Sequence, residues 1–296
     1  FFAVAFSIYW AISGHTARKA WLLVCSYVFY GSWNWNFLWL IVASTVIDFA
    51  VGLGLSRSDR AGPRRALLVL SLTVNLGLLG LFKYYDFFIT SGAGLLQSLG
   101  FELEPRTLGL VLPVGISFYT FQTLSYTIDV YRRKMAPHRS LLDFALFVGF
   151  FPQLVAGPIV RAIDFVPQLA KRKVFADVDV RACVTLFLLG FVKKACVSDN
   201  MAPIVDDVFS DPAAFTGMSR LLGVSFYSVQ LYCDFSGYSD MAIATAGLLG
   251  FKLPENFRFP YMATSLTDLW GRWHITLATW FRDYLYIPLG GNRGSN

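Results

Sequence analysis

Long apolar stretches separated by short polar breaks are the feature that most constrains this chain. The clearest are residues 20–33, 37–55, 66–82, 108–130, 141–160, 182–198 and 218–233. A helix needs about 20 mainly apolar residues to cross a bilayer. Hydrophobic residues make up 55% of the 296 residues and charged residues only 15%, against about one quarter in soluble domains. We therefore expect an all-α, polytopic integral membrane protein in which residues 1–296 form a single transmembrane domain.

Four of the polar breaks are rich in Lys and Arg. They hold His15 to Lys19; Arg57, Arg60, Arg64 and Arg65; Arg132, Arg133, Lys134 and Arg139; and Arg161 with Lys171, Arg172 and Lys173. Cytoplasmic loops carry such an excess of basic residues, so these breaks are expected to face the cytoplasm. The net charge of +6 is then a property of membrane topology and not of nucleic-acid binding. Segment 86–99 is too short to span and is expected to lie along the outer interface.

Segment 141–160 is flanked by basic residues on both sides, which predicts that it enters and leaves on the same face. It also carries Pro152, Gly157 and Pro158, and proline breaks the helical hydrogen-bond ladder. Interrupted backbone at membrane depth requires burial in protein or a wet cavity. We expect a re-entrant element here. The alternative is an ordinary kinked span that crosses the membrane, which would reverse the membrane orientation of every segment after it.

Two apolar segments carry polar residues. In 232–242, Asp234 and Asp240 indicate either a substrate-facing polar cluster or a helix break at Gly237 near the interface. The sequence favours neither alternative. The Ser/Thr-rich segment 113–131 is expected to serve helix packing first and pore lining second. The four scattered cysteines are expected to be small buried hydrophobes, not disulfides or metal ligands.

A further helix is predicted over 266–286. Ser265 and Asp268 have capping-box-like spacing at its start, and Pro288 with the glycines that follow marks its end. Asp268 and Arg272 are four residues apart, as in a structural ion pair on a helix.

Two rows of residues are predicted along this helix. The first is a stripe of large side chains: Trp270, Trp273, Leu277, Trp280 and Tyr284. The second places His274 and Arg282 on one side with the small Ala278 between them, which leaves room for a ligand. On the residues alone, packing is the favoured role for His274. A general-base role stays open because neutral imidazole can accept a hydroxyl proton near pH 7.

Four stretches of the sequence together favour a catalytic role for His274 over a packing role. They are LPVGISFYTFQTLSYTIDVYR (112–132), FPQLVAGPIVR (151–161), DFSGYSDMAIA (234–244) and ENFRFPYMATSLTDLWGRWHITLATWFRDYLYIPLGGNRG (255–294). The chain resembles the membrane-bound O-acyltransferase (MBOAT) family, and most closely its bacterial branch that O-acetylates alginate. The branch that transfers D-alanine to teichoic acid is similar but more distant. The last stretch is long and is the most specific part of the resemblance.

The resemblance implies an MBOAT-like helical bundle in the bacterial inner (cytoplasmic) membrane, with a wet funnel through it. Such an enzyme moves an acyl group from a cytoplasmic donor, such as acetyl-CoA or an acyl carrier, to hydroxyls of an exported, alginate-like polysaccharide. Partner acetyltransferase proteins are implied, but no bound cofactor. The alternatives are D-alanyl or fatty-acyl transfer, or a non-enzymatic transport or scaffold subunit.

Residue roles follow from the same resemblance. His274 matches the tryptophan–histidine motif and is the expected catalytic residue, whereas the second family histidine lies beyond this chain and matches neither His15 nor His138. We therefore expect a fragment, truncated at the C-terminus and also at the N-terminus, that lacks half of the histidine pair. The expected substrate- and donor-binding residues, for which anchoring or packing is the alternative, are Arg282, Asp234, Arg258, Arg161 and Arg293.

Overall fold

The computed structural model describes residues 1–101 and 104–291, and over these residues the chain is helical without any β-strand. The all-α prediction is thus confirmed for the described part of the chain. The residues group into two compact units. Unit 1 comprises Phe1–Leu22, Phe150–Val160 and Pro167–Asn296, and unit 2 comprises Leu23–Gly149 and Arg161–Val166. The interpretation of the chain as a single domain stays a prediction.

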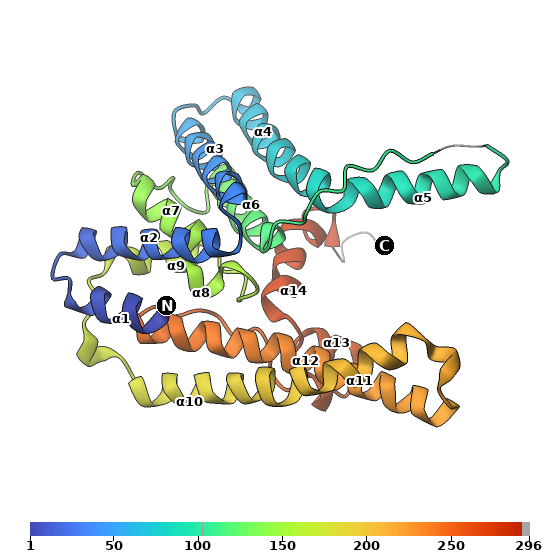
Figure 1. Cartoon of the computed structure of the whole chain (residues 1–296). Helices are drawn as coiled ribbons and strands as arrows, with labels where there is room; N and C mark the ends of the chain where they lie inside the picture. Colours follow the sequence, from blue (N-terminus) through green and yellow to red (C-terminus); the bar gives the residue numbers. More distant parts are fainter. Residues whose placement is uncertain (102–103, 292–296) are drawn as a thin grey trace. The chain divides into compact units, whose positions relative to one another are not determined.

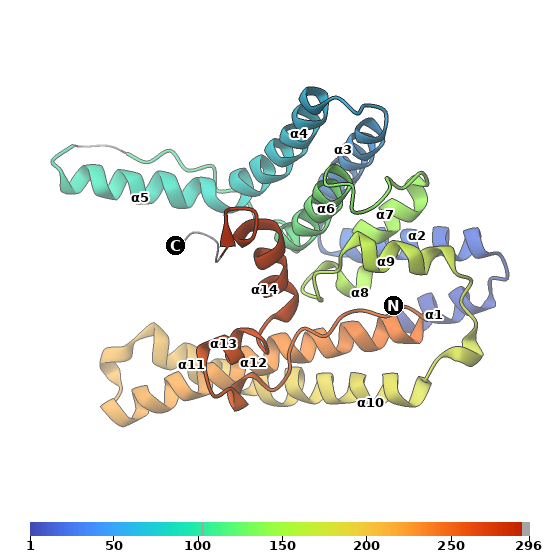
Figure 2. The same cartoon turned by 180° about the vertical axis from the view of Figure 1, so that it is seen from behind.

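Unit 1 is built mainly around two helices that run side by side, α10 and α12 (Figures 1 and 2). Its helices are α1 (Phe2–Ala11), the start of α2 (His15–Asn34), α8 (Phe151–Leu154), the end of α9 (Ala162–Ala170), α10 (Val180–Phe191), α11 (Asp199–Ser210), α12 (Gly217–Leu248), α13 (Leu266–Trp270) and α14 (Ile275–Phe281). A π-helical segment, Val192–Ser198, joins α10 to α11, and another, Arg282–Tyr286, follows α14.

Helix α12 runs for 32 residues without a break, which excludes the helix break at Gly237 that was one of the two alternatives for this segment. Gly237 instead allows close packing: a Cβ added there would lie 2.6 Å from the carbonyl oxygen of Gly190, and the reverse holds for Gly190. Lys193 Nζ then lies 2.6 Å from an Asp240 carboxylate oxygen, and Lys194 Nζ lies 2.6 Å from Asp234. The polar residues of α12 therefore pair with the lysines that precede α11, because the close helix contact brings them together.

Unit 2 contains the remainder of α2, α3 (Leu38–Ser56), α4 (Ala61–Leu79), α5 (Tyr85–Ser98), α6 (Ile116–Tyr131), α7 (Leu141–Gly149) and the start of α9. A π-helical segment, Gly80–Tyr84, joins α4 to α5 without interruption. Residues 86–99 thus continue the helix that begins at Ala61, because a π-bulge accommodates the irregular turn. Their expected location along the outer interface stays a prediction. By length and composition, His15–Ser56 and Ala61–Ser98 are able to cross a membrane. The other expected crossings stay predictions.

A buried carboxylate organises α3, α4 and α6. Asp48 is fully buried and accepts hydrogen bonds from Ser71 Oγ at 2.5 Å, Asn75 Nδ2 at 2.8 Å and Thr127 Oγ1 at 3.3 Å. Thr123 donates to Asn75 Oδ1 at 3.3 Å. Two hydroxyls of the Ser/Thr-rich helix thus bind neighbouring helices, which confirms its predicted packing role.

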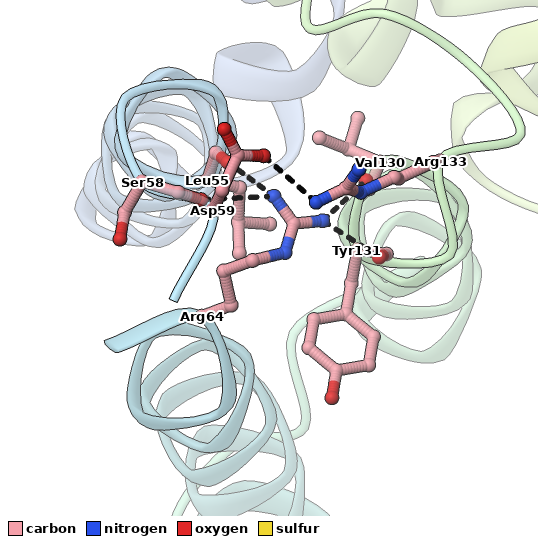
Figure 3. A network of polar contacts seen from close by, with 7 residues as sticks. All are labelled: Leu55, Ser58, Asp59, Arg64, Val130, Tyr131 and Arg133. Carbon is pink, nitrogen blue, oxygen red and sulfur yellow. Dashed lines mark hydrogen bonds and ion pairs between the residues drawn. The ribbon is translucent and has the colours of Figure 1, made fainter. Parts of the chain in front are cut away.

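Arg64 shows that a basic break can be structural (Figure 3). This side chain is buried, and its guanidinium donates to Tyr131 O at 2.7 Å, Val130 O at 3.3 Å and Leu55 O. These carbonyls close the C-terminal ends of α3 and α6, where a cation is favourable. Arg64 therefore joins three helices.

The predicted interruption in 141–160 is present. Helix α7 ends at Gly149, Phe150 has a non-helical ψ of 109°, and α8 has only four residues. Pro152 lies in the first turn of α8, where proline is tolerated, so the break precedes it. The re-entrant path of this segment through a membrane stays a prediction.

The cysteines only partly follow their prediction. All four are free; Cys25 and Cys233 are buried and Cys183 is partly buried, but Cys196 is exposed. The predicted burial of Cys196 is wrong. Its segment, Val192–Ser198, packs on α12 through other residues, and the Cys196 side chain stays exposed.

Candidate active site

The helix predicted over 266–286 is broken at the histidine. Helix α13 ends at Trp270, α14 begins at Ile275, and His274 itself has φ 41° and ψ 53°, in the left-handed region. A residue with a Cβ occupies this region at a cost of about 1–2 kcal/mol. Such a conformation persists only where the surroundings impose it, and it is enriched at functional sites. The start of the helix is as predicted, with Ser265 Oγ accepting from the Asp268 amide at 3.1 Å.

The loop before α13 imposes the break. The backbone amide of Ile275 donates to Asn256 O at 2.9 Å, and the backbone amide of Arg258 donates to Arg272 O at 2.9 Å. These bonds hold the chain on both sides of His274. They replace amide and carbonyl partners that a continuous helix would have supplied.

The side chain of Asn256 also holds the start of α14 in place. It is buried; its Oδ1 accepts from Thr276 Oγ1 at 2.9 Å and its Nδ2 donates to Ser239 Oγ at 3.0 Å. Thr276 Oγ1 also accepts from the Ile159 amide at 3.0 Å. The residues beside His274 are thus tied to α12 and to the segment after α8, all within unit 1.

Aromatic rings surround the imidazole. The ring of Phe235 on α12 meets His274 edge to face at 4.6 Å between centroids, and Phe257 stacks at 6.3 Å with an interplanar angle of 19°. Phe257 in turn packs edge to face on Trp273 at 5.2 Å. These contacts fix the ring orientation and leave His274 partly buried.

One face of the broken helix lines a cavity of about 1100 Å³. His274, Ala278 and Arg282 all contribute to it, which confirms that they share a side. The rest of the lining is mostly apolar: Thr267, Trp270, Trp273, Leu277, Phe281, Leu285, Tyr286, Leu289 and Gly291. The predicted single aromatic stripe is wrong in its second half, because Trp280 and Tyr284 are buried and pack on each other at 5.1 Å.

Comparison with known sequences assigns the family. Residues 133–296 match the family model of the membrane-bound O-acyltransferases, which covers more than half of the chain. The chain belongs to the MBOAT family. The members of this family are membrane-bound O-acyltransferases by its description, which agrees with the resemblance found in the sequence.

Curated relatives agree with this assignment. The chain is 44% identical over its whole length to a probable alginate O-acetylase AlgI of Pseudomonas aeruginosa, of which it covers 56%. It is 39% identical over 93% of its length to a peptidoglycan O-acetyltransferase of Helicobacter pylori, of which it covers 56%. Over 60% of its length it is 30% identical to a teichoic acid D-alanyltransferase of Bacillus subtilis, of which it covers 46%. The chain therefore spans about half the length of the curated relatives it matches.

The other predicted site residues of this MBOAT chain are dispersed. Arg282 lines the cavity with His274, and its Nε donates to Asp283 at 2.7 Å. Asp234 pairs with Lys194, and Arg258 forms an exposed pair with Glu255 at 2.7 Å.

Two further predicted residues do not belong to the described part of the cavity-bearing unit. Arg161 belongs to unit 2, and Arg293 lies outside the described residues. Among the predicted substrate- and donor-binding residues, only Arg282 belongs to the described lining of the cavity that contains His274.

Sequence reasoning missed the residues that support the histidine. Phe235, Asn256, Phe257 and Thr276 were not singled out, although all four lie within the stretches 234–244 and 255–294 that carry the family resemblance. Asn256 lies in a charged loop next to Glu255, where a polar side chain gives no sign that it is buried and needs a partner. Its partners lie 17 and 20 positions away, beyond any local pattern.

Asn256 offers a test of this support. We expect Asn256→Ala in the full-length protein to lower the rate constant for acyl transfer about tenfold or more, because a misplaced catalytic group loses orientation. Unfolding should become easier by about 1–3 kcal/mol, since buried partners lose their hydrogen bonds. Initial rates at saturating donor and thermal unfolding would measure the two effects.

The matched control for Asn256 is Thr279→Val. Thr279 lies on the same helix and is partly buried, but its hydroxyl donates within the helix to Ile275 O at 2.8 Å. It should keep near-normal rates. Equal losses in both variants would show that Asn256 has no special role in placing His274.

Proposed function

We propose that this chain forms the core of a multi-pass O-acyltransferase of the bacterial inner membrane that moves an acetyl group from a cytoplasmic donor to hydroxyls of an exported polysaccharide. The observation that carries the proposal is His274, held in a strained left-handed conformation in the wall of a largely apolar cavity. The choice of acetyl as the transferred group and of a polysaccharide as the acceptor rests on the names of the alginate and peptidoglycan relatives.

The chemistry assigned to His274 is general-base catalysis. Its neutral imidazole accepts the proton of an acceptor hydroxyl while the hydroxyl oxygen forms a bond to the acyl carbonyl carbon. The tetrahedral intermediate then breaks its carbon–sulfur bond and releases the donor as a thiol, which takes up the proton that His274 held. The aromatic rings of Phe235 and Phe257 keep the imidazole oriented during both steps.

The cavity supplies the site for the acyl group. Its lining beside His274 is apolar at Trp273, Leu277 and Ala278, which suits an acetyl methyl group and excludes water from the thioester. Arg282 is assigned to the anionic part of donor or acceptor, since it reaches the same cavity. Asp234, Arg258 and Arg161, which are not in the described lining of this cavity, are assigned to other contacts with the donor or the acceptor.

The donor proposed is acetyl-CoA or an acyl carrier, and partner acetyltransferase proteins are proposed on the extracytoplasmic side. Acetyl transfer is favoured over D-alanyl transfer for two reasons. Identity to the alginate relative is 44%, against 30% to the teichoic acid relative. The described cavity lining also contains no carboxylate to pair with a D-alanyl ammonium group.

Deletion and complementation in the host cell test this function. Deleting the gene should remove ester-linked acetyl groups from the exported polysaccharide, as read by proton NMR, while the amount of exported polymer stays normal. Complementation with the full-length gene should restore the esters. Loss of polymer export would support a transport role instead, and unchanged acetylation would refute the enzyme.

A further inference from the structure

A second cavity of unit 1 lies where the segment before α10 meets the end of α12. It measures about 540 Å³, and the described residues that line it include none of those around His274. Four cations line it, Lys171, Arg172, Lys173 and Lys252, together with two carboxylates, Asp177 and Asp179. The positive groups therefore outnumber the negative ones by two.

The chain segments that carry these lysines are held in place. The guanidinium of Arg18 donates to Lys173 O at 2.9 Å and to Ile12 O at 2.5 Å. The side chain of Gln168 bonds both backbone groups of Lys252, accepting from the amide at 2.9 Å and donating to the carbonyl at 3.0 Å. The lysines thus converge from fixed positions rather than from free loops.

Lys173 lies deepest in this group. Its Nζ is 4.7 Å from the centre of the Phe251 ring, and its side chain packs on Gly250, where an added Cβ would lie 3.3 Å from it. Burial, with Lys171 and Lys252 nearby, lowers the pKa of the Lys173 ammonium. The carboxylate of Asp179, which also lines the cavity, accepts from the Ala182 amide at the start of α10 at 2.9 Å.

We propose that this cavity binds a phosphate-bearing anion at the membrane surface. Converging lysines are suited to phosphate, which they meet as point charges. The basic segment at 171–173 was predicted to face the cytoplasm, where anionic phospholipid headgroups are concentrated and basic pockets bind them. A soluble phosphate compound would meet the same groups, so the test includes both sources.

Cys183 provides a native reporter, because it lines this cavity and is partly buried. The full-length protein would be placed in nanodiscs under three conditions. The reference is phosphatidylcholine alone, the second adds phosphatidylglycerol to the lipid, and the third adds inorganic pyrophosphate to the buffer. Alkylation of Cys183 by N-ethylmaleimide would be followed by mass spectrometry, with the exposed Cys196 as internal reference. A ligand present at about ten times its Kd should slow Cys183 about tenfold and leave Cys196 unchanged.

Variants assign the effect to the lysines. Lys173→Gln combined with Lys252→Gln should abolish the protection, and Lys134→Gln, from an exposed basic loop of unit 2, should keep it. If the double variant does not fold, Lys252→Gln alone serves, because its backbone bonds to Gln168 do not depend on its side chain. Protection by phosphatidylglycerol identifies a lipid headgroup, and protection by pyrophosphate alone identifies a soluble ligand. Absence of protection by either, or full protection in the lysine variants, overturns the proposal.

Discussion

Replacing His274 with alanine in the full-length protein should lower acyl transfer by about 100-fold or more, the range that general acid–base catalysis contributes. The loss should appear in the rate constant at saturating donor and much less in KM, because the imidazole acts on the hydroxyl proton and not on donor binding. Transfer of radiolabelled acetyl groups in membrane vesicles, measured as initial rate against donor concentration, checks this result.

The control for His274 is His138→Gln. His138 is also partly buried and lies 3.3 Å from an Asp143 oxygen, but it belongs to unit 2 and has no proposed part in the reaction. Its variant should retain transfer. A His274→Ala protein with normal rates would remove the catalytic assignment and restore the packing role that local chemistry first favoured.

Filling the cavity should have the second-largest effect. Ala278 lines it with His274 and Arg282, and a tryptophan there would occupy space proposed for the acyl group. We expect Ala278→Trp to reduce kcat/KM about 100-fold, comparable with the cost of displacing reacting groups by 1 Å. The melting temperature should change little, because the new side chain enters existing space rather than a packed core. Transfer assays and thermal unfolding on the same preparation measure both.

Two variants control for the added bulk. Ala278→Ser preserves the small size and should retain most of the activity. Leu188→Trp adds a similar ring on α10, at a side chain that is 55% exposed, and should be neutral. If Ala278→Trp transfers acetyl groups normally, the cavity beside His274 is not the acyl site.

Local features of the site were predictable because their partners lie within one or two helical turns. The Ser265 cap and the ion pair of Arg272 Nε with Asp268 at 2.7 Å are examples. So is the shared side of His274 and Arg282, which survives because both flank the same short helix. Patterns of three to four residues carry this information directly.

The break at His274 was not predictable from these patterns. Residues 266–286 favour a continuous helix by capping and periodicity, but Asn256 and the backbone of Arg258 bind the chain on both sides of the histidine. These bonds outweigh local helix propensity, which is a weak preference of less than about 1 kcal/mol per residue. The same reasoning applies to Arg64, whose carbonyl partners at Val130 and Tyr131 lie 66 and 67 positions away.

The amino-acid sequence by itself determined the helical class, the membrane character and, through the stretch around His274, the family of this chain. Composition and short-range periodicity are sufficient for these, because they depend on solvent and on neighbouring residues. The tertiary structure alone decided the left-handed turn at His274, the pairing of Lys193 and Lys194 with α12, and the convergence of lysines on a second cavity. Each of these depends on contacts between segments far apart in the chain, whose meeting no local pattern specifies.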